Sequence, residues 1–137
     1  MAVVTVMLLL IGLVSVAVTG QIDKARQATT RAQLKQIESA LAFYQMDNGR
    51  YPTSEQGLDA LVNEPALAPQ PRNYRPDGYL QGGAVPLDAW GEDYLYESPG
   101  QMNPRSFDIW SMGADAQAGG EELDADIGNW PEDSELR

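Results

Sequence analysis

Hydrophobic residues run almost without a break over the first part of the chain and then recur at helical spacing. Between Val3 and Val18 only three small or polar residues interrupt a run of Val, Leu, Ile, Met and Ala, and the first ionisable side chain is Asp23. Further along, apolar residues fall at three- and four-residue steps, at Leu34, Ile37, Leu41 and Tyr44. The two patterns together predict one helix over residues 1–48, ~70 Å long at ~1.5 Å per residue, with Gly49 ending it.

The first part of this helix is long enough to be a membrane anchor. Its uncharged stretch through Ile22 reaches the roughly 20 residues that span a bilayer. The eleven aliphatic residues between Val3 and Val18 contribute roughly −3 to −7 kcal/mol to insertion. A cleaved signal peptide is the alternative, but it requires a basic region before the apolar core, and Met1–Leu10 contains no Lys or Arg. We therefore expect a retained single-pass anchor over residues 1–21.

The charges that follow the predicted anchor conflict with an extracytoplasmic placement. Four basic residues lie within a short distance of the span, namely Lys24, Arg26, Arg31 and Lys35. By the positive-inside rule alone, this side would face the cytoplasm. Basic residues in a leader ahead of Met1 would reverse that orientation.

The remaining chain has the pattern of a small α+β domain. Thr53 and Gln56 have the spacing of a capping box, which predicts a short helix to about Val62. Four prolines within residues 65–76 indicate an extended surface loop on which Tyr74 is a packing anchor. Aromatic and β-branched residues predict strands at Tyr94–Glu97 and Ser106–Ser111, and a further short strand at Tyr79–Leu80. We expect the strands to form an antiparallel sheet on the long helix.

Composition excludes several classes of function. The chain has 9 Lys and Arg against 20 Asp and Glu, for a net charge of −11, so nucleic acid is not an expected partner. It contains no Cys, which excludes disulfides, zinc-thiolate sites and thiol nucleophiles, and no His, which excludes imidazole triads. A catalytic site would have to use carboxylates, Lys or Tyr, and we do not expect an enzyme.

An acidic loop near the end of the chain is a candidate metal site. Asp115, Asp124 and Asp126 supply three carboxylates within a glycine-bearing loop, and calcium takes about six to eight oxygen ligands. The spacing is not that of an EF-hand, because Gln117 and Gly119 stand where further acids would fall. From the residues alone, the loop is either a calcium site or a solvated acidic surface.

Five motifs, in this order, resemble the major pseudopilin of the bacterial type II secretion system, a branch of the type IV pilin-like superfamily. The match covers roughly Ile22 to Trp130, and the motifs are Arg50–Leu58, Asn73–Arg75, Pro86–Gly91, Ser98–Gly100 and Asp124–Trp130. The resemblance implies a type IV pilin-like α+β fold in which a long N-terminal helix packs on a small antiparallel sheet. It implies three parts: an apolar transmembrane and polymerisation segment (1–21), a pilin domain that includes the amphipathic half of the helix (22–130), and a charged tail (131–137).

The same resemblance implies the role and the partners. Family members are single-pass proteins of the bacterial inner membrane with the domain in the periplasm, and a prepilin peptidase cleaves and N-methylates them. They polymerise with copies of themselves, together with minor pseudopilins and an inner-membrane secretion platform, into a filament that drives folded proteins across the outer membrane. The family also binds one calcium ion. On the matching positions, its ligands here would be Asp115, Asp124 and Asp126, with the Met112 carbonyl a further candidate.

Two alternatives are kept. The chain could be a membrane-anchored, calcium-dependent binding module that acts alone, with Trp90, Trp110 and Trp130 as ligand platforms. Against this, aromatic residues in so small a domain are more often core residues. It could also be a subunit of another type IV pilin-like filament, although those commonly carry a disulfide that this chain cannot form.

Overall fold

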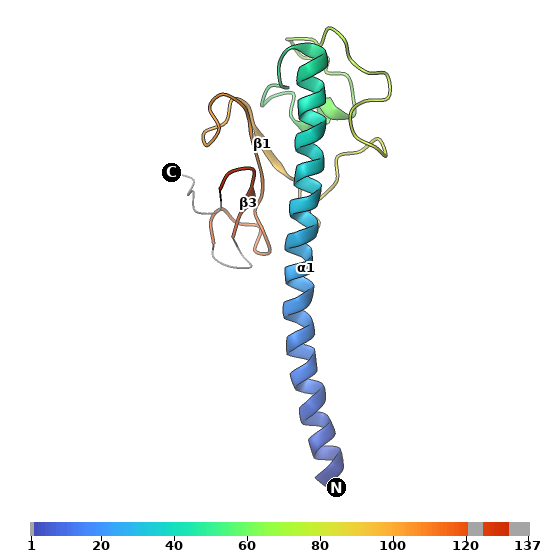
Figure 1. Cartoon of the computed structure of the whole chain (residues 1–137), viewed down its shortest axis with the longest axis vertical. Helices are drawn as coiled ribbons and strands as arrows, with labels where there is room; N and C mark the ends of the chain where they lie inside the picture. The colour runs from blue at the N-terminus through green and yellow to red at the C-terminus, as the bar shows by residue number, and fades with distance from the viewer. Residues whose placement is uncertain (1, 121–124, 132–137) are drawn as a thin grey trace.

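A single long helix, α1 (Ala2–Asn48), organises the molecule. The computed structural model describes residues 2–120 and 125–131, and for residues 2–20 it describes the backbone only. Figure 1 shows α1 running the length of the molecule, with the rest of the chain gathered around its C-terminal half and the N-terminal half projecting alone. The predicted helix over residues 1–48 is thus confirmed for all but Met1.

The structure does not describe the side chains of most of the predicted anchor. Among the residues whose side chains it describes, no helix is long and apolar enough to cross a membrane. The predicted segment, residues 1–21, shares only Gln21 with that part of the chain. The anchor therefore stays a prediction.

The helix ends and the chain turns as the sequence predicts, but the second helix is shorter than expected. Gly49 has a φ of 78° and its N–H donates to the Gln45 carbonyl at 2.7 Å. The capping box is present: the Thr53 N–H donates to Gln56 Oε1 at 3.0 Å, and the Gln56 N–H donates to Thr53 Oγ1 at 3.1 Å. Only a 3₁₀ helix, η1 (Leu58–Leu61), follows, because Gly57 has a φ of 64° that interrupts helical geometry.

Three short strands form one antiparallel sheet in the order β1-β2-β3. They are β1 (Leu95–Glu97), β2 (Asp108–Ser111) and β3 (Ile127–Gly128). In the register, Tyr96 lies opposite Ile109 and Ser111 lies opposite Ile127. The predicted strands overlap β1 and β2, whereas the predicted strand at Tyr79–Leu80 is wrong. The Tyr79 N–H donates to the Leu61 carbonyl at 2.7 Å, so it binds η1 instead of a neighbouring strand.

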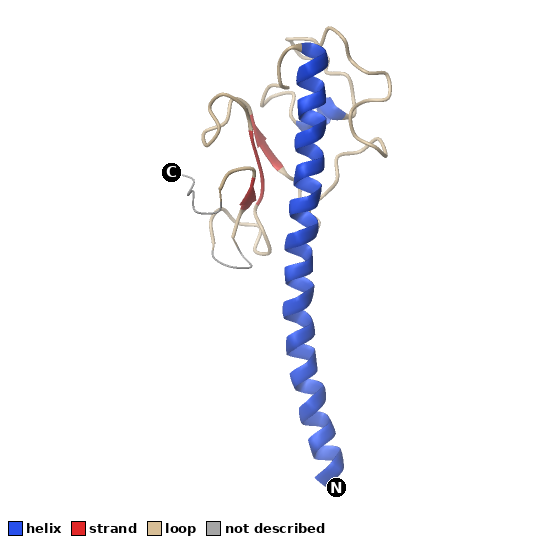
Figure 2. Ribbon diagram, in the orientation of Figure 1, coloured by secondary structure: helices blue, strands red, loops and turns tan. Residues whose placement is uncertain are grey.

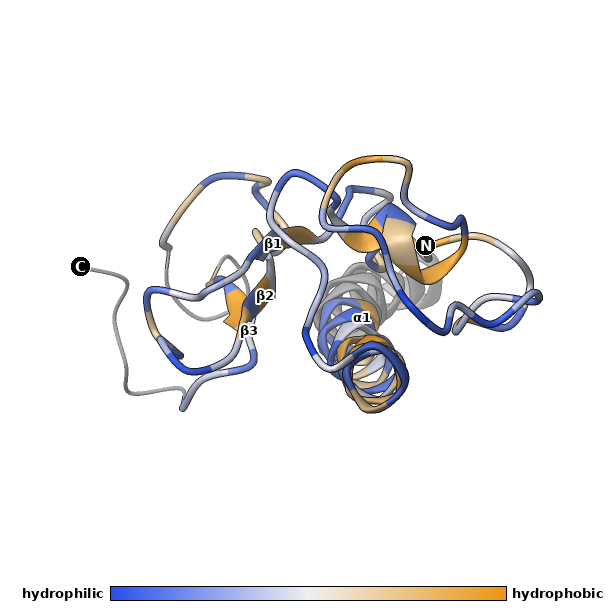
Figure 3. Cartoon of the chain, turned by 90° about the horizontal axis from the view of Figure 1, so that it is seen from above, coloured by the Kyte–Doolittle hydropathy of each residue, from blue (hydrophilic) through white to orange (hydrophobic). Residues whose placement is uncertain are grey.

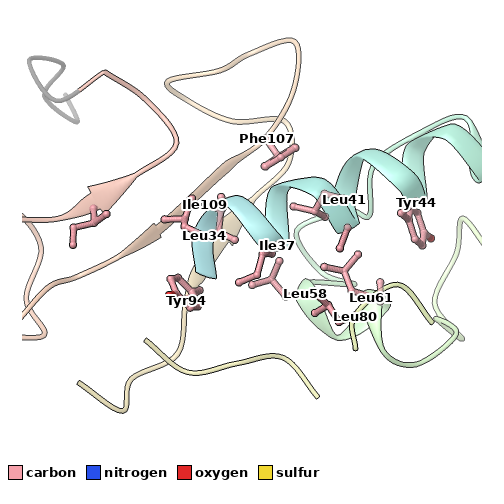
Figure 4. Close-up of a cluster of buried hydrophobic side chains, with 13 residues drawn as sticks. Leu34, Ile37, Leu41, Tyr44, Leu58, Leu61, Leu80, Tyr94, Phe107 and Ile109 are labelled. Carbon is pink, nitrogen blue, oxygen red and sulfur yellow. The ribbon is translucent and has the colours of Figure 1, made fainter. Parts of the chain in front are cut away.

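The core lies between α1 and two separate groups of residues. Figure 3, viewed along α1, shows the sheet on one side of the helix and η1 with its loops on another. Ile37 and Leu41 of α1 are fully buried. Figure 4 shows the helix residues facing both groups, whose labelled members are Tyr94, Phe107 and Ile109 on the sheet side and Leu58, Leu61 and Leu80 on the other. The apolar stripe predicted from spacing is therefore the face of α1 that packs on the domain.

Loops make up most of the domain, as Figure 2 shows, and side-chain hydrogen bonds attach them to α1. At the end of α1, Asn48 is buried; its Nδ2 donates to the Tyr44 carbonyl, and its Oδ1 accepts the Asn73 N–H at 2.9 Å. The Tyr74 ring packs edge-on against Tyr44 and Tyr79, with centroids 6.4 and 5.5 Å away. Tyr74 is thus the packing anchor of the proline-rich loop, as predicted.

Candidate metal-binding loop

The candidate metal-binding loop, residues 112–126, connects β2 to the neighbouring antiparallel strand β3, so it begins and ends at the same end of this strand pair. Ser111 pairs with Ile127 in the antiparallel ladder. The two ends of the loop, Met112 and Asp126, directly adjoin this pair, so the ladder keeps their backbones close together. The sheet therefore brings together two predicted ligands that are far apart in the sequence.

Asp126 has one carboxylate oxygen that is hydrogen-bonded and one that is buried without a partner among the described residues. Its Oδ2 accepts the Gly119 N–H at 3.1 Å, while its Oδ1 is the buried oxygen. Burial raises the pKa of Asp126, the Gly119 N–H opposes this, and the nearby charge of Asp115 raises the pKa further. A buried carboxylate oxygen beside a second carboxylate is an arrangement that a bound cation would stabilise.

Asp115 lies on an exposed turn near Asp126. Its Oδ1 accepts the Gln117 N–H at 3.1 Å, and Ala116 between them has a φ of 53°, in the region that L-residues rarely occupy. Asp115 lies close enough to Asp126 for its charge to raise the pKa of Asp126.

The third predicted carboxylate cannot be placed. Asp124 lies outside the described residues. Within the described ranges, no group of three or more His, Cys, Asp or Glu residues could hold a metal ion. The structure thus places Asp115 close enough to Asp126 to affect its pKa, and Met112 and Asp126 next to the pair Ser111–Ile127, and says nothing of Asp124. The donors present are all oxygens, and Asp126 has one buried oxygen without a donor, so the site fits a hard cation such as calcium.

Two buried polar residues that the sequence reasoning missed support the start of the loop. Ser111 Oγ donates to Asp88 Oδ2 at 2.6 Å, and both residues are buried. Asp88 lies in the turn Pro86–Gly91, which the sequence analysis treated only as one of the motifs of the resemblance. Asp88 Oδ1 accepts the N–H of Trp90 at 3.0 Å and the N–H of Glu92 at 2.9 Å. An Asp at the start of a turn commonly makes such bonds, and this was the sequence signal for Asp88.

The end of the loop is fixed by Asn129 and Trp130. Asn129 Oδ1 accepts the Ile109 N–H at 3.1 Å and its Nδ2 donates to the Phe107 carbonyl at 2.9 Å, so this side chain extends the pairing of β2 beyond β3. The Trp130 ring packs over Gly128, where an added Cβ would meet the ring at 2.5 Å. Trp130 also lies 5.9 Å from the Trp110 ring, between centroids.

The tryptophans take part in packing, in agreement with the core interpretation. Trp90 packs against the hydrophobic core and is half-buried. Trp110 and Trp130 are also half-buried and contact each other. None of the three is among the exposed large hydrophobic side chains of the described residues. A role as ligand platforms gains no support from this arrangement.

The second functional element is the part of α1 that the domain leaves uncovered. The domain is attached to α1 at Thr30, where Thr30 Oγ1 accepts the Ala89 N–H at 3.2 Å and the Thr30 carbonyl accepts the Tyr94 hydroxyl at 3.2 Å. Thr30 is fully buried, whereas Ile22 is 46% exposed. The N-terminal half of the helix projects from the rest of the domain (Figure 1).

A projecting helix that carries a small antiparallel sheet on its C-terminal half defines the pilin-like class of proteins. Comparison with known proteins identifies the family: residues 17–130 match the family "Type II secretion system (T2SS), protein G", and the chain belongs to it.

Its relatives and a solved structure agree. The chain is 44% identical over 130 residues to the type II secretion system core protein G of Pseudomonas aeruginosa, and the aligned region covers 95% of this chain and 89% of that protein. It is 46% identical over 130 residues to the core protein G of Aeromonas hydrophila, covering 95% and 86%. The crystal structure of the major pseudopilin of enterohaemorrhagic Escherichia coli superposes with a TM-score of 0.70 at 46% identity, covering 82% of this chain and 92% of that one.

Proposed function

We propose that this chain is the structural subunit of a type II secretion pseudopilus and polymerises through α1. The observation that carries the proposal is the N-terminal half of α1, which projects from the rest of the domain (Figure 1). A helix of 47 residues with an apolar first part needs partners along its length. Other copies of the same helix supply such partners in a filament.

Before assembly, lipid would take the place of those copies. The apolar segment, residues 1–21, would span the inner membrane with the domain in the periplasm, and the basic residues from Lys24 to Lys35 would follow the span. This orientation opposes the positive-inside rule, so it depends on basic residues ahead of Met1. The expected partners are a prepilin peptidase, minor pseudopilins and the inner-membrane secretion platform.

We further propose that the candidate metal-binding loop binds calcium through Asp115, Asp124, Asp126 and the Met112 carbonyl. The ion would supply positive charge where the carboxylates otherwise repel each other. Two observations support this set: Met112 and Asp126 adjoin the paired residues Ser111 and Ile127, and Asp115 lies close enough to Asp126 to affect its pKa. The role is structural, since a bound ion stabilises the folded loop against the sheet.

Polymerisation is tested by a charge in the apolar segment. Leu10→Arg places an ion in the predicted span at a cost of about 2.5 to 3.5 kcal/mol. Because this offsets about half or more of the free energy of insertion, the full chain, expressed with its secretion system, should then be depleted from the membrane fraction and form fewer filaments than wild type in negative-stain electron microscopy. Gln81→Arg, the same change on an exposed loop of the domain, is the matched control and should form filaments.

Monomers from the unaltered chain would favour the alternative, a calcium-dependent binding module that acts alone. Filaments from Leu10→Arg at the wild-type level would show that the apolar segment is not the polymerisation element.

A further inference from the structure

A buried hydrogen bond joins two segments that lie 23 residues apart in the sequence. The Ser111 hydroxyl, at the end of β2, donates to Asp88 Oδ2 at 2.6 Å. Ser111 is fully buried and Asp88 is 5% exposed. A short bond between a buried hydroxyl and a carboxylate is among the stronger hydrogen bonds in proteins, so it holds both groups in place.

The Asp88 carboxylate is itself held rigidly. Its Oδ1 accepts the N–H groups of Trp90 and Glu92, and its own N–H donates to the Glu92 carbonyl at 2.8 Å. The next residue, Ala89, donates its N–H to Thr30 Oγ1 of α1. The turn that presents Asp88 is thus closed on itself and fixed to the long helix.

Ser111 also holds the first residues of the loop through a hydrogen bond to Gly113. Its Oγ accepts the Gly113 N–H at 3.1 Å, and Gly113 is buried with a φ of 75°. Met112 lies between Ser111, which the ladder pairs with Ile127, and Gly113, which Ser111 holds. The backbone of Met112 is therefore fixed on both sides.

We propose that Asp88 and Ser111 are positioning residues for calcium in the candidate metal-binding loop. They hold the Met112 backbone close to that of Asp126 and set the direction in which the chain leaves towards Asp115. Without them the loop would have to be ordered when the ion binds, which lowers affinity. The inference rests on the calcium site proposed above. It adds that the site is prepared by a turn of the domain that also contacts α1.

The test is the affinity of the full chain, in detergent, for calcium chloride, measured by isothermal titration after removal of metal. Loss of a group that supports metal ligands typically weakens binding by about 10- to 100-fold. Ser111→Ala and Asp88→Asn should each show a weakening of this size, and Ser111→Thr, which keeps the hydroxyl, should bind within about threefold of wild type. Tyr96→Phe is the control: it loses the bond from the Tyr96 hydroxyl to the Pro52 carbonyl at 2.8 Å, which involves no residue of the loop. It should melt at a lower temperature and bind calcium as wild type does.

Circular dichroism identifies the variants that fold. If Ser111→Ala does not, Ser111→Cys keeps the shape of the side chain and replaces the hydroxyl with a slightly larger thiol that hydrogen-bonds only weakly, and a weakening in the same direction is expected. If wild type takes up no calcium, the calcium site itself fails and this inference with it. If wild type binds calcium and folded Ser111→Ala binds it equally well, the calcium site stands and the positioning role is overturned.

Discussion

Asp126→Asn should have opposite effects on the stability of the domain with and without calcium. Without the ion, the substitution removes a charge whose Oδ1 is buried without a partner in the described structure and which the Asp115 carboxylate repels. It should therefore stabilise the calcium-free domain. Because Asp126 is only half-buried and solvent screens the repulsion, we expect a gain of no more than about 1 kcal/mol.

With calcium, the same substitution should remove most of the stabilisation. Free calcium at ~100 times its Kd stabilises a folded protein by ~2.7 kcal/mol. For a domain of about 110 residues, the unfolding entropy is roughly 0.23 kcal/mol/K, which converts this to ~12 °C in Tm. Wild type should thus melt ~12 °C higher in calcium than in chelator. Asp126→Asn should melt up to ~4 °C above wild type in chelator and gain almost nothing from calcium.

The assay is thermal unfolding of the full chain followed by circular dichroism, in chelator and in millimolar calcium. Asp93→Asn, the same change at an exposed position outside the loop, is the control and should keep the full calcium response. An unchanged melting curve for wild type in the two conditions, or an equal calcium response in Asp126→Asn, would refute the reasoning.

Three further predictions concern the stability of the domain. Asp108 is fully buried and its carboxylate accepts the Met102 N–H and two N–H groups of Asn103, so Asp108→Asn should cost about 3 kcal/mol in urea unfolding, and a loss below ~1 kcal/mol would contradict these bonds. Ala116→Gly should raise Tm by a few degrees, because the αL conformation costs Ala about 1 to 2 kcal/mol; a lower Tm would show that the turn is unstrained. Burial raises the pKa of Tyr74 to about 12 and raises the pKa of four other tyrosines. The stability that these buried tyrosines contribute is complete below the unfolded pKa of ~10 and is lost as pH rises through the folded values. Near-ultraviolet tyrosinate absorbance should therefore rise together with unfolding above ~pH 10. Titration of these tyrosines near pH 10 with the fold intact would contradict their burial.

Local patterns predicted the parts of the fold that local physics controls. The spacing of Leu34, Ile37 and Leu41 predicted the buried face of α1, and the spacing of Thr53 and Gln56 predicted a capping box that the structure contains. The length of the next helix was wrong, because a positive φ at Gly57 limits it to one 3₁₀ turn. One predicted strand was wrong as well, since Tyr79 binds the carbonyl of Leu61.

The support of the candidate metal-binding loop depends on contacts that no local pattern contains. The acidic positions of the loop could be identified from their residue types and from the resemblance. The bond from Ser111 to Asp88 could not, because it joins residues 23 positions apart and forms only when the turn at Asp88 packs beside β2. In the same way, β3 is only two residues long, and its pairing is completed by the side chain of Asn129.

The most direct measurement of the central claim is electron microscopy of filaments from the full chain, produced with its secretion system, in calcium and in chelator. The account predicts long filaments in millimolar calcium, few or short filaments in chelator, and no increase on adding calcium to Asp126→Asn. Equal numbers of wild-type filaments in calcium and chelator would contradict a calcium-stabilised subunit. The absence of filaments in both conditions would contradict polymerisation through α1.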